Sequence, residues 1–498
     1  MIIFVSSSWW GSVNQLKMNK PFVGRDKERK ILEEMYQSSS SELVSITGRR
    51  RVGKTFLVRH VFENRIDFDV IGSQFGDTRE QLLNFNYSLS RAKNAIERSP
   101  TPKDWQLAFF ELEDYLRSLG DKDRKKVIFI DEIPWLAAND PLFIRSFSHF
   151  WNSYAEWNNV LVIICGSAAS WIVRKIIRDR GGLHNRVTKR IYLKPYTLAE
   201  TERYFQQKNI QFNRYSIVQV YMVTGGIPFY LNEFKSGESV PQSIDRICFE
   251  KNGLLNSEFK DLYLALFDDG KRHVQIVRAL ANSPYGLSRQ QIVAQTKLSN
   301  GGTLSDMLEE LVFCGFILEL RHFSKRKKGK IYRLVDEYSL FYIRFIEPML
   351  SEGKDTWMNL VKEQAYVTWT GYAFENLGFT HLTQIKKALG VSGVLTSTYA
   401  YQHAGNEHTA GVQIDMVIER KDNVINLCEF KFYKDPVNLS INQAEALRQR
   451  ETSFRELTKS KSILFTTMVA PFGITTATNV KGVIQQTVML DDLFEEGS

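Results

Sequence analysis

Residues 42–62, ELVSITGRRRVGKTFLVRHVF, place a glycine-rich turn between an extended apolar segment and a helical pattern. The turn at positions 48–55 has the form GxxxxGK[ST], with the required strand before it and helix after it. Its glycines allow backbone N–H groups to point inward around a phosphate, at the positive end of the following helix. The stretch therefore predicts a parallel α/β domain with a phosphate-binding loop.

This loop carries the two side chains that a bound nucleoside triphosphate requires. We expect Lys54 to reach the β- and γ-phosphates of ATP and Thr55 to ligate Mg²⁺. Further contacts with the nucleotide are expected from the rest of the loop, which comprises Gly48, Arg49, Arg50, Arg51, Val52 and Gly53.

A second apolar run, in KKVIFIDEIPWL at 125–136, ends in two acids. A continuous apolar run is typical of a strand buried on both faces, and open α/β sheets bind ligands at the carboxyl ends of their strands. Asp131 is expected in the Mg²⁺ shell and Glu132 beside the attacking water. A third apolar run ends at Ser167, which either orients the water or senses the γ-phosphate, or only forms a turn.

The totals describe an ordinary globular chain of 498 residues, too long for one hydrophobic core, so two to four domains are expected. A net charge of +9 is compatible with nucleic acid. Four separated cysteines indicate reduced thiols in a cytoplasmic protein, and no apolar run is long enough to span a membrane. Residues 1–17 are expected to be an extension that adds nothing to the fold, and not a signal peptide.

Residues 271–335 show three short helical patterns, then two strands around the polar tip HFSKRKKGK. This order predicts a winged helix-turn-helix. Its expected recognition helix, 303–314, carries acids and no Lys or Arg, although base reading normally requires basic or amide side chains. The tip could touch phosphates through Lys325, Arg326, Lys327, Lys328 and Lys330. Two roles stay open, namely contact with DNA and packing that relays nucleotide state.

The segment QIDMVIERKDNVINLCEFKFY, 413–433, reads as a hairpin with acids among its apolar residues. Centring the turn on Asp422 places Asp415 opposite Glu429, with Lys431 on the same face. Like charges facing each other across a strand pair are destabilising unless a cation lies between them, and Mg²⁺ prefers such oxygen ligands. The hairpin therefore predicts a site for Mg²⁺ or Mn²⁺, with Lys431 as a catalytic cation beside it.

Six segments in order, FVGRDKE, GRRRVGKT, FIDEIPWL, CGSAASW, KPYTLAE and TGGIPFYL, resemble the archaeal-type AAA+ ATPases related to the STAND nucleotide switches. The resemblance covers roughly residues 20–260. It implies that Phe22, Val23, Gly24 and Arg25 flank the adenine and that Pro228 touches the base from a helical lid. It also implies that Arg186 reaches a neighbour's γ-phosphate in a homo-oligomer, although the basic cluster around it could be a solvated face.

The hairpin spacing Asp-x13-Glu-x-Lys resembles the PD-(D/E)xK nuclease signature over roughly residues 365–490. In such proteins a preceding helix often supplies another acid, which here matches Glu375. The resemblance implies metal ligands at Glu375, Asp415 and Glu429. The proline of the signature is absent, since Ile414 precedes Asp415. The arrangement also matches a domain of unassigned function that is commonly fused to archaeal-type ATPases.

These observations predict an α/β protein with a P-loop parallel sheet, a helical lid, a winged helix and a restriction-endonuclease-like domain. The expected boundaries are 1–17, 18–195, 196–262, 263–350 and 351–498. The favoured function is an ATPase whose nucleotide state regulates a metal-dependent, DNA-directed nuclease-like domain. The alternative is a non-cleaving ATP switch that regulates protein partners or transcription.

Overall fold

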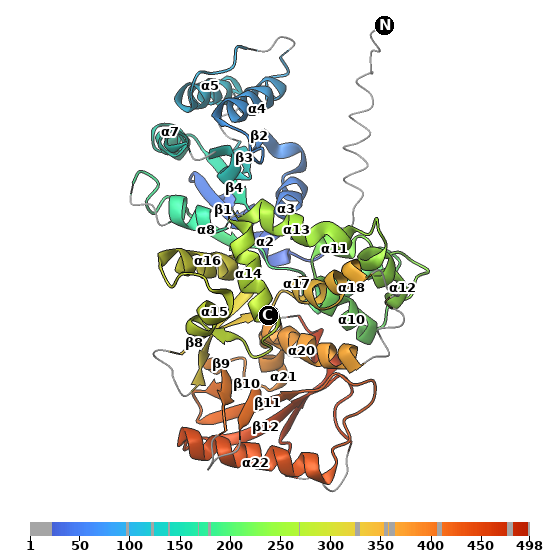
Figure 1. Ribbon diagram of the computed structural model, residues 1–498. Coiled ribbons are helices and arrows are strands. Elements are labelled where there is room, and N and C mark those ends of the chain that lie inside the picture. The colour runs from blue at the N-terminus through green and yellow to red at the C-terminus, as the bar shows by residue number, and fades with distance from the viewer. Residues whose placement is uncertain are drawn as a thin grey trace. The chain divides into compact units, whose positions relative to one another are not determined.

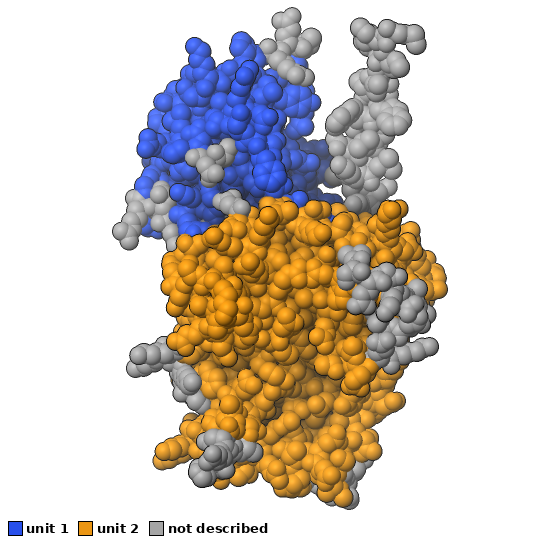
Figure 2. Space-filling model, viewed as in Figure 1, with its two compact units in different colours: residues 1–195 blue, residues 196–498 orange. Residues whose placement is uncertain are grey.

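The computed structural model describes residues 22–496 except for short segments, which are 96–98, 121–123, 138–139, 168, 178–180, 268, 324–328, 353–356, 358–363, 406–410 and 476–481. The chain divides into two compact units, residues 1–195 and 196–498 (Figure 2). This division coincides with the predicted boundary between the nucleotide-binding core and the lid. The predicted extension, 1–17, and most of the predicted basic tip lie outside the described residues.

The first unit is built on a five-stranded sheet of order β2-β3-β4-β1-β5 in which every pair of neighbours is parallel. Strands β1, β3 and β4 are buried along their whole length, which explains their nearly continuous apolar sequences. Because β4 lies between β1 and β3, the carboxyl ends of these three strands meet at one edge. The strands are β1 (Glu42–Thr47), β2 (Ile66–Ile71), β3 (Lys126–Asp131), β4 (Val160–Gly166) and β5 (Lys189–Tyr192).

Three amphipathic helices cover one face of this sheet, namely α4 (Thr78–Ala92), α5 (Trp105–Ser118) and α7 (Pro141–Ser153). Each begins after an aspartate whose side chain accepts a hydrogen bond from a backbone N–H of the first turn. Their aromatic side chains form one cluster, in which the rings of Trp105 and Phe143 lie 4.8 Å apart edge to face. The remaining helices of the unit are α2 (Asp26–Gln37), α3 (Lys54–Val61), α6 (Ile133–Ala137) and α8 (Ala169–Ile172).

The second unit begins with a helical part, which occupies the predicted lid. Its α-helices are α9 (Leu198–Gln207), α10 (Arg214–Thr224), α11 (Pro228–Leu231), α12 (Val240–Ile244) and α13 (Leu254–Leu266). The predicted boundary at residue 262 falls inside α13. There follow α14 (Gly270–Ala281), β6 (Leu287–Ser288), α15 (Arg289–Thr296), α16 (Gly302–Phe313), β7 (Ile317–His322) and β8 (Lys330–Leu334), in the predicted order of three helices and a hairpin.

A single eight-stranded sheet runs through the rest of this unit, in the order β13-β12-β11-β10-β9-β7-β8-β6. Strand β7 pairs in parallel with β9, through Arg321 with Tyr399 and His322 with Ala400. The predicted boundary at residue 350 therefore does not separate two sheets. The additional strands are β9 (Thr396–His403), β10 (Val412–Arg420), β11 (Val424–Phe430), β12 (Ile463–Val469) and β13 (Gln486–Val488).

Helices cover both faces of this sheet (Figure 1). Helix α22 (Ile441–Thr458) packs Phe454 against one face, next to Tyr401 at 4.8 Å. Helix α20 (Gln364–Thr380) lies on the other face, where Phe374 and the backbone at Gly378 contact the ring of Phe430. Three shorter helices, α17 (Glu337–Phe341), α18 (Glu347–Glu352) and α21 (Leu382–Ala388), precede β9, and α23 (Leu490–Leu493) follows β13.

The four cysteines are free and buried, as predicted. Among the helices of the described residues, none combines the length and the apolarity that crossing a bilayer requires.

His381, between α20 and α21, joins the helical part to the rest of the second unit. Its Nε2 accepts a hydrogen bond of 3.1 Å from the backbone N–H of Leu198, while Nδ1 lies 3.1 Å from the carbonyl oxygen of Leu377. This geometry requires a neutral ring with its proton on Nδ1. Burial lowers the pKa of His381 from 6.5 to about 4.

Acid should therefore destabilise the second unit through His381. Since the pKa is lower in the folded state, protonation favours the unfolded state, and stability is lost as the pH falls from 6.5 toward 4. Between pH 7 and pH 5 we expect a loss of about 2 kcal/mol that His381→Gln removes. Urea titrations followed by circular dichroism at both pH values measure it. His149→Gln, at an exposed position, should behave as wild type, and an unchanged pH dependence in His381→Gln would contradict the assignment.

Candidate functional site

The loop between β1 and α3 has the backbone geometry that a phosphate cradle needs. Gly48 has φ of +148° and Gly53 has φ of +94°, both in the region that favours glycine. A Cβ atom on Gly48 would lie 2.3 Å from the carbonyl oxygen of Leu193, so no other residue fits there. The turn therefore requires both glycines of the motif.

Lys54 lies at the centre of this loop with its amino group held inward. Its Nζ donates to the carbonyl oxygens of Gly48 at 3.1 Å and Arg49 at 3.2 Å, and to Ser167 Oγ at 3.1 Å. The side chain is buried, and the loop carbonyls hold its cation where the phosphates of a nucleotide would lie. These contacts agree with the role predicted for Lys54.

The residues predicted for the metal shell of ATP meet where α3 begins and β3 ends. Thr55 Oγ1 donates to Asp131 Oδ2 at 2.6 Å, so the hydroxyl and the carboxylate are positioned for one shared ion. Burial raises the pKa of Asp131, and the hydrogen bond from Thr55 opposes this shift. A divalent cation would remove the cost of burying this carboxylate, and hydroxyl and carboxylate oxygens are ligands that Mg²⁺ accepts. The donor set therefore fits Mg²⁺.

Glu132 is held by Ser167 at the end of β4. Its carboxylate accepts from the Ser167 backbone N–H at 2.9 Å and from Ser167 Oγ at 2.5 Å. Glu132 itself has φ of +46°, a conformation that non-glycine residues rarely adopt and that is often found at functional sites. The structure thus brings Lys54, Glu132 and Ser167 into one hydrogen-bonded chain.

The FVGR segment lies against the same loop. The Arg25 guanidinium donates to the carbonyl oxygen of Val52 at 3.3 Å, and the ring of Phe22 stacks on His60 of α3 at 4.0 Å. Val23 is buried, and Gly24 and Arg25 both have positive φ. The segment is thereby fixed beside α3, although its predicted contact with adenine remains a prediction.

The three arginines of the loop and two further predicted residues, Arg186 and Pro228, each lie in a different environment. Arg50 lies over the ring of Trp135 at 5.9 Å, Arg49 is buried, and Arg51 has φ of +70°. Arg186 Nη1 lies 2.5 Å from Glu156 Oε1 within the first unit, so its guanidinium already has a partner there. Pro228 is the first residue of α11 in the second unit, and its contact with the base stays a prediction.

The geometry of the first unit defines a class of protein, the P-loop nucleotide-binding ATPases. Residues 22–234 match the family described as an ATPase domain predominantly from Archaea. The chain therefore carries an archaeal-type ATPase domain, and it is an ATPase.

The chain is also similar to two relatives and to a solved structure. An uncharacterized protein of Methanocaldococcus jannaschii is 26% identical over 392 residues, which are 78% of this chain and 83% of the relative. An uncharacterized ATP-binding protein of the same organism is 21% identical over 50% of this chain and 80% of its own length. The Walker-type ATPase PABY2304 of Pyrococcus abyssi has a similar fold, with a TM-score of 0.50 and 20% identity over 66% of this chain and 97% of its own.

The second unit holds the other predicted set of charged residues. The predicted hairpin register is confirmed from Met416, which pairs with Cys428, to Glu419, which pairs with Ile425. Asp415 and Glu429 stand one step beyond the Met416–Cys428 pair, where β10 has an irregularity against β9. Asp415 Oδ2 there accepts a hydrogen bond of 3.0 Å from the backbone N–H of Phe430.

The three predicted carboxylates are close enough to influence one another. Burial raises the pKa of Asp415, and the negative charges of Glu375 and Glu429 raise it further. Burial also raises the pKa of Glu375, although Arg333 opposes that shift. Burial lowers the pKa of Lys431, but the adjacent Glu429 outweighs it and the net shift is upward. The site is thus a buried cluster of acids in need of positive charge.

Basic side chains supply that charge in the structure. Glu429 Oε1 lies 2.9 Å from Lys431 Nζ, and Glu429 Oε2 lies 2.6 Å from Arg450 Nη1. Glu375 Oε2 lies 2.9 Å from the guanidinium of Arg333, which is buried on β8. Within the described residues no group of three or more His, Cys, Asp or Glu side chains has metal-site geometry. Carboxylates from this cluster could still hold Mg²⁺, which usually takes one or two of them plus phosphate oxygens and water.

Sequence reasoning missed Arg333, Arg450 and His381. Arg333 lies between Tyr332 and Leu334 in an ordinary strand pattern, and Arg450 lies among several charges on α22. The sequence around each arginine does not indicate its ion pair, because the partner carboxylate is far away in the sequence. An isolated His381 likewise gives no reason to expect a buried neutral ring.

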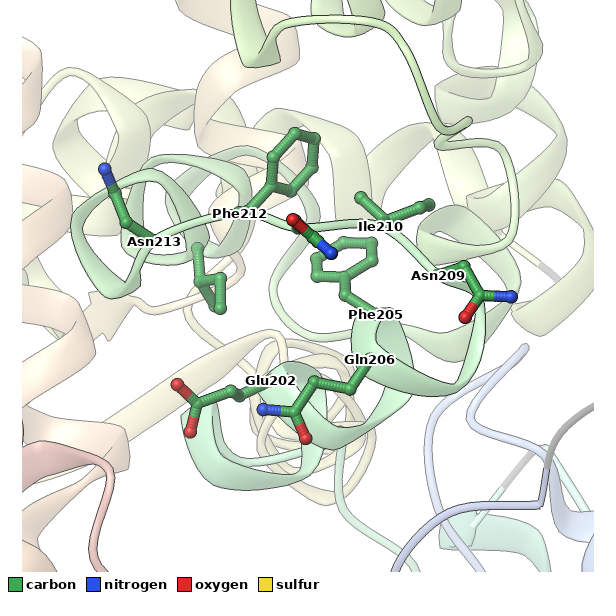
Figure 3. A pocket seen from close by; sticks show the side chains of 9 residues that line it. Glu202, Phe205, Gln206, Asn209, Ile210, Phe212 and Asn213 are labelled. Carbon is green, nitrogen blue, oxygen red and sulfur yellow. The ribbon is translucent and has the colours of Figure 1, made fainter.

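A separate hollow of about 440 Å³ lies between α9 and α10 (Figure 3). Glu202 is its one carboxylate, and Arg214 binds that group at 2.9 Å. The other polar side chains of its lining are amides, namely Gln206, Asn209, Gln211 and Asn213. The residues that line this hollow therefore do not include a combination of acid, base or nucleophile suited to catalysis.

Two substitutions should separate nucleotide binding from turnover. Lys54→Ala removes the cation at the centre of the loop, so ATP binding should be lost. Glu132→Gln keeps the shape and loses the charge that orients water, so binding should persist while hydrolysis falls by about two orders of magnitude or more. Calorimetric ATP titration and phosphate release measure the two properties. Glu63→Gln, a surface change in the same domain, is the control, and normal turnover in Glu132→Gln would overturn the assignment.

Proposed function

We propose that the ATPase domain regulates a metal-dependent, nuclease-like site in the second unit that acts on DNA. The observation that carries the proposal is the cluster of Glu375, Asp415 and Glu429, whose negative charges act on one another beside Lys431. Buried like charges destabilise a fold unless a cation compensates them. Lys431, Arg450 and Arg333 supply this compensation in the structure, and a divalent cation could take over part of it.

Asp415 of β10 and Glu429 of β11 would hold the divalent ion, Mg²⁺ or Mn²⁺. The ion supplies Lewis-acid chemistry to a phosphodiester when bound. Lys431, with its pKa raised by Glu429, stays protonated and would offset negative charge that develops on the phosphate. Phe430, through its backbone N–H, fixes the orientation of the Asp415 carboxylate.

Glu375 is the proposed third ligand and has a competing partner. To bind the ion it would have to exchange a buried ion pair with Arg333, whose guanidinium also donates to Asn376 Oδ1 at 2.7 Å. Breaking a buried pair by removing one partner costs about 3–5 kcal/mol. We therefore expect Glu375 to contribute less to metal affinity than Asp415.

The helices α14, α15 and α16 and the hairpin β7–β8 support the proposed contact with DNA. Their order is that of a winged helix-turn-helix, and β6 pairs with β8. Lys330 is paired with Glu319 at 2.9 Å, so this lysine already has a counter-charge. Phosphate contact would then depend on Lys325, Arg326, Lys327 and Lys328, which lie outside the described residues.

The acids of α16 support the alternative, a non-cleaving ATP switch that regulates protein partners. Asp306 is exposed on this helix, where it would repel the phosphates of DNA. Glu310 is bound by His273 Nε2 at 2.9 Å and serves the internal packing of the unit. A helix of this composition suits a basic protein surface better than a major groove.

Regulation by nucleotide is supported by the way the helical part is built into the second unit. Gln219 of α10 donates to the Tyr366 hydroxyl at 3.0 Å, and Arg214 binds Asp491 at 2.9 Å. The ring of Tyr215 stacks on Phe432 at 4.6 Å, next to the Lys431 backbone. A nucleotide that touches the lid, as proposed for Pro228, would act on the element that packs beside the candidate metal site.

Metal should stabilise the second unit only if Asp415 is intact. A ligand that binds only the folded state raises the unfolding free energy, by about 2.7 kcal/mol at a hundred times its dissociation constant. We expect Mn²⁺ to raise the melting temperature of the nucleotide-free full-length protein, and Asp415→Asn to abolish both this rise and any cleavage of DNA while ATP hydrolysis persists.

The matched control is Asp422→Asn in the hairpin turn, where an exposed Asp422 binds Arg420. Thermal unfolding with added Mg²⁺ and Mn²⁺ should be like wild type in this variant. Cleavage assays on single- and double-stranded DNA and RNA, with and without ATP, identify the substrate. Identical metal responses in wild type and Asp415→Asn would favour the non-cleaving switch.

Arg186 provides a test of the proposed homo-oligomer. If its guanidinium leaves Glu156 to reach a neighbour's γ-phosphate, hydrolysis per protomer should rise with protein concentration, and Arg186→Ala should flatten that rise. Initial rates across the range in which light scattering detects assembly measure this. A specific activity that does not change across that range would indicate that Arg186 serves only the contact with Glu156.

A further inference from the structure

Arg450 reaches from α22 to one of the two carboxylates of the candidate metal site. Its Nη1 lies 2.6 Å from Glu429 Oε2, on the side of the carboxylate opposite the Lys431 contact at Oε1. The Glu429 side chain is only 10% exposed, whereas that of Arg450 is 41% exposed. A buried carboxylate is thus covered by a cation that can leave into solvent.

The two arginines of the cluster differ in their freedom to move. Arg333 is 2% exposed, donates to both Glu375 and Asn376, and lies between the rings of Tyr372 at 4.8 Å and Phe379 at 5.0 Å. Arg450 has no second hydrogen-bond partner in the described part of the chain. Arg333 is therefore part of the packing, while Arg450 is held by a single carboxylate.

A divalent ion at Asp415 and Glu429 would change the balance at Arg450. The ion would take the charge of Glu429 and place two positive charges near the guanidinium, which repel it. The nearest group with negative charge would then be a phosphate bound to the same ion. A guanidinium donates two parallel hydrogen bonds that match the oxygens of a phosphate.

We propose that Arg450 is a phosphate-binding residue of this site, which exchanges Glu429 for a backbone phosphate of a nucleic acid when the divalent ion binds. The proposal rests on the metal site of the proposed function and adds the group that recognises the substrate. A contact of this kind positions the strand without reading its sequence. We test single-stranded nucleic acid first, since its backbone phosphates can approach a site near the end of β11.

Removal of the guanidinium should have opposite effects on the two ligands. Without Arg450 the ion has one competitor fewer for Glu429, so metal affinity rises. The nucleic acid loses a charged partner, so its affinity falls. A residue with a purely structural role would weaken both or neither.

The experiment uses full-length, metal-stripped, nucleotide-free protein. Mn²⁺ binding is measured by electron paramagnetic resonance, and a fluorescein-labelled oligothymidylate is titrated by anisotropy with Ca²⁺ present to prevent cleavage. In Arg450→Gln we expect Mn²⁺ to bind about two- to fivefold more tightly. We expect oligothymidylate to bind about tenfold more weakly, with a logarithmic salt slope reduced by about 0.7.

The control is Arg448→Gln on the same helix. Arg448 is 51% exposed and lies 3.4 Å from Glu445, so this substitution removes the same charge away from Glu429. It should leave Mn²⁺ affinity unchanged. Arg450→Lys keeps the charge without the paired donors and should restore part of the oligothymidylate affinity.

Two results would overturn the assignment of Arg450. One is weaker or equal Mn²⁺ binding in Arg450→Gln, and the other is oligothymidylate affinity equal to that of Arg448→Gln. Asp415→Asn, measured in parallel, separates this failure from that of the metal site. If Asp415→Asn loses Mn²⁺ binding while Arg450→Gln matches its control, only the role of Arg450 is wrong. Unchanged Mn²⁺ binding in Asp415→Asn removes the metal site and the Arg450 proposal with it.

Discussion

The buried guanidinium of Arg333 is the contact on which the architecture of the second unit depends. A buried charge must have a counter-charge and filled hydrogen bonds, so Glu375 and Asn376 of α20 have to lie beside strand β8. Asn376 in turn donates to the carbonyl oxygen of Leu334 at 3.0 Å, which ties the helix to the strand in both directions. The helices and hairpin before residue 350 and the sheet after it are therefore one piece.

The two candidate sites follow the same physical rule. In the first unit Glu132 is held by Ser167, which also accepts from Lys54. In the second unit Glu429 is held by Lys431 and Arg450. Each of these carboxylates is bound by the protein's own donors, and a ligand that brings its own charge would compete for them. Such exchange lets a site stay stable when empty and still respond to its ligand.

The one-piece construction of the second unit also bears on communication between ligands. The helical part contacts α20, α21 and α23 through His381, Tyr366 and Asp491. A shift of α9 or α10 would have to break these contacts or move the residues on the other side of them. The part of the chain that resembles a nucleotide lid is therefore mechanically connected to the carboxylate cluster within the same unit.

The sequence by itself determined the elements whose chemistry is local. The GxxxxGK[ST] loop, the acid-terminated strand and the hairpin register around Asp422 follow from glycine geometry, apolar runs and alternation, which act between near neighbours in the chain. The tertiary structure alone decided that β7 joins β9, that Arg333 takes Glu375, that Arg450 covers Glu429 and that His381 stays neutral. These contacts join residues far apart in the sequence, and a charged side chain gives no local sign of which distant partner its burial will require.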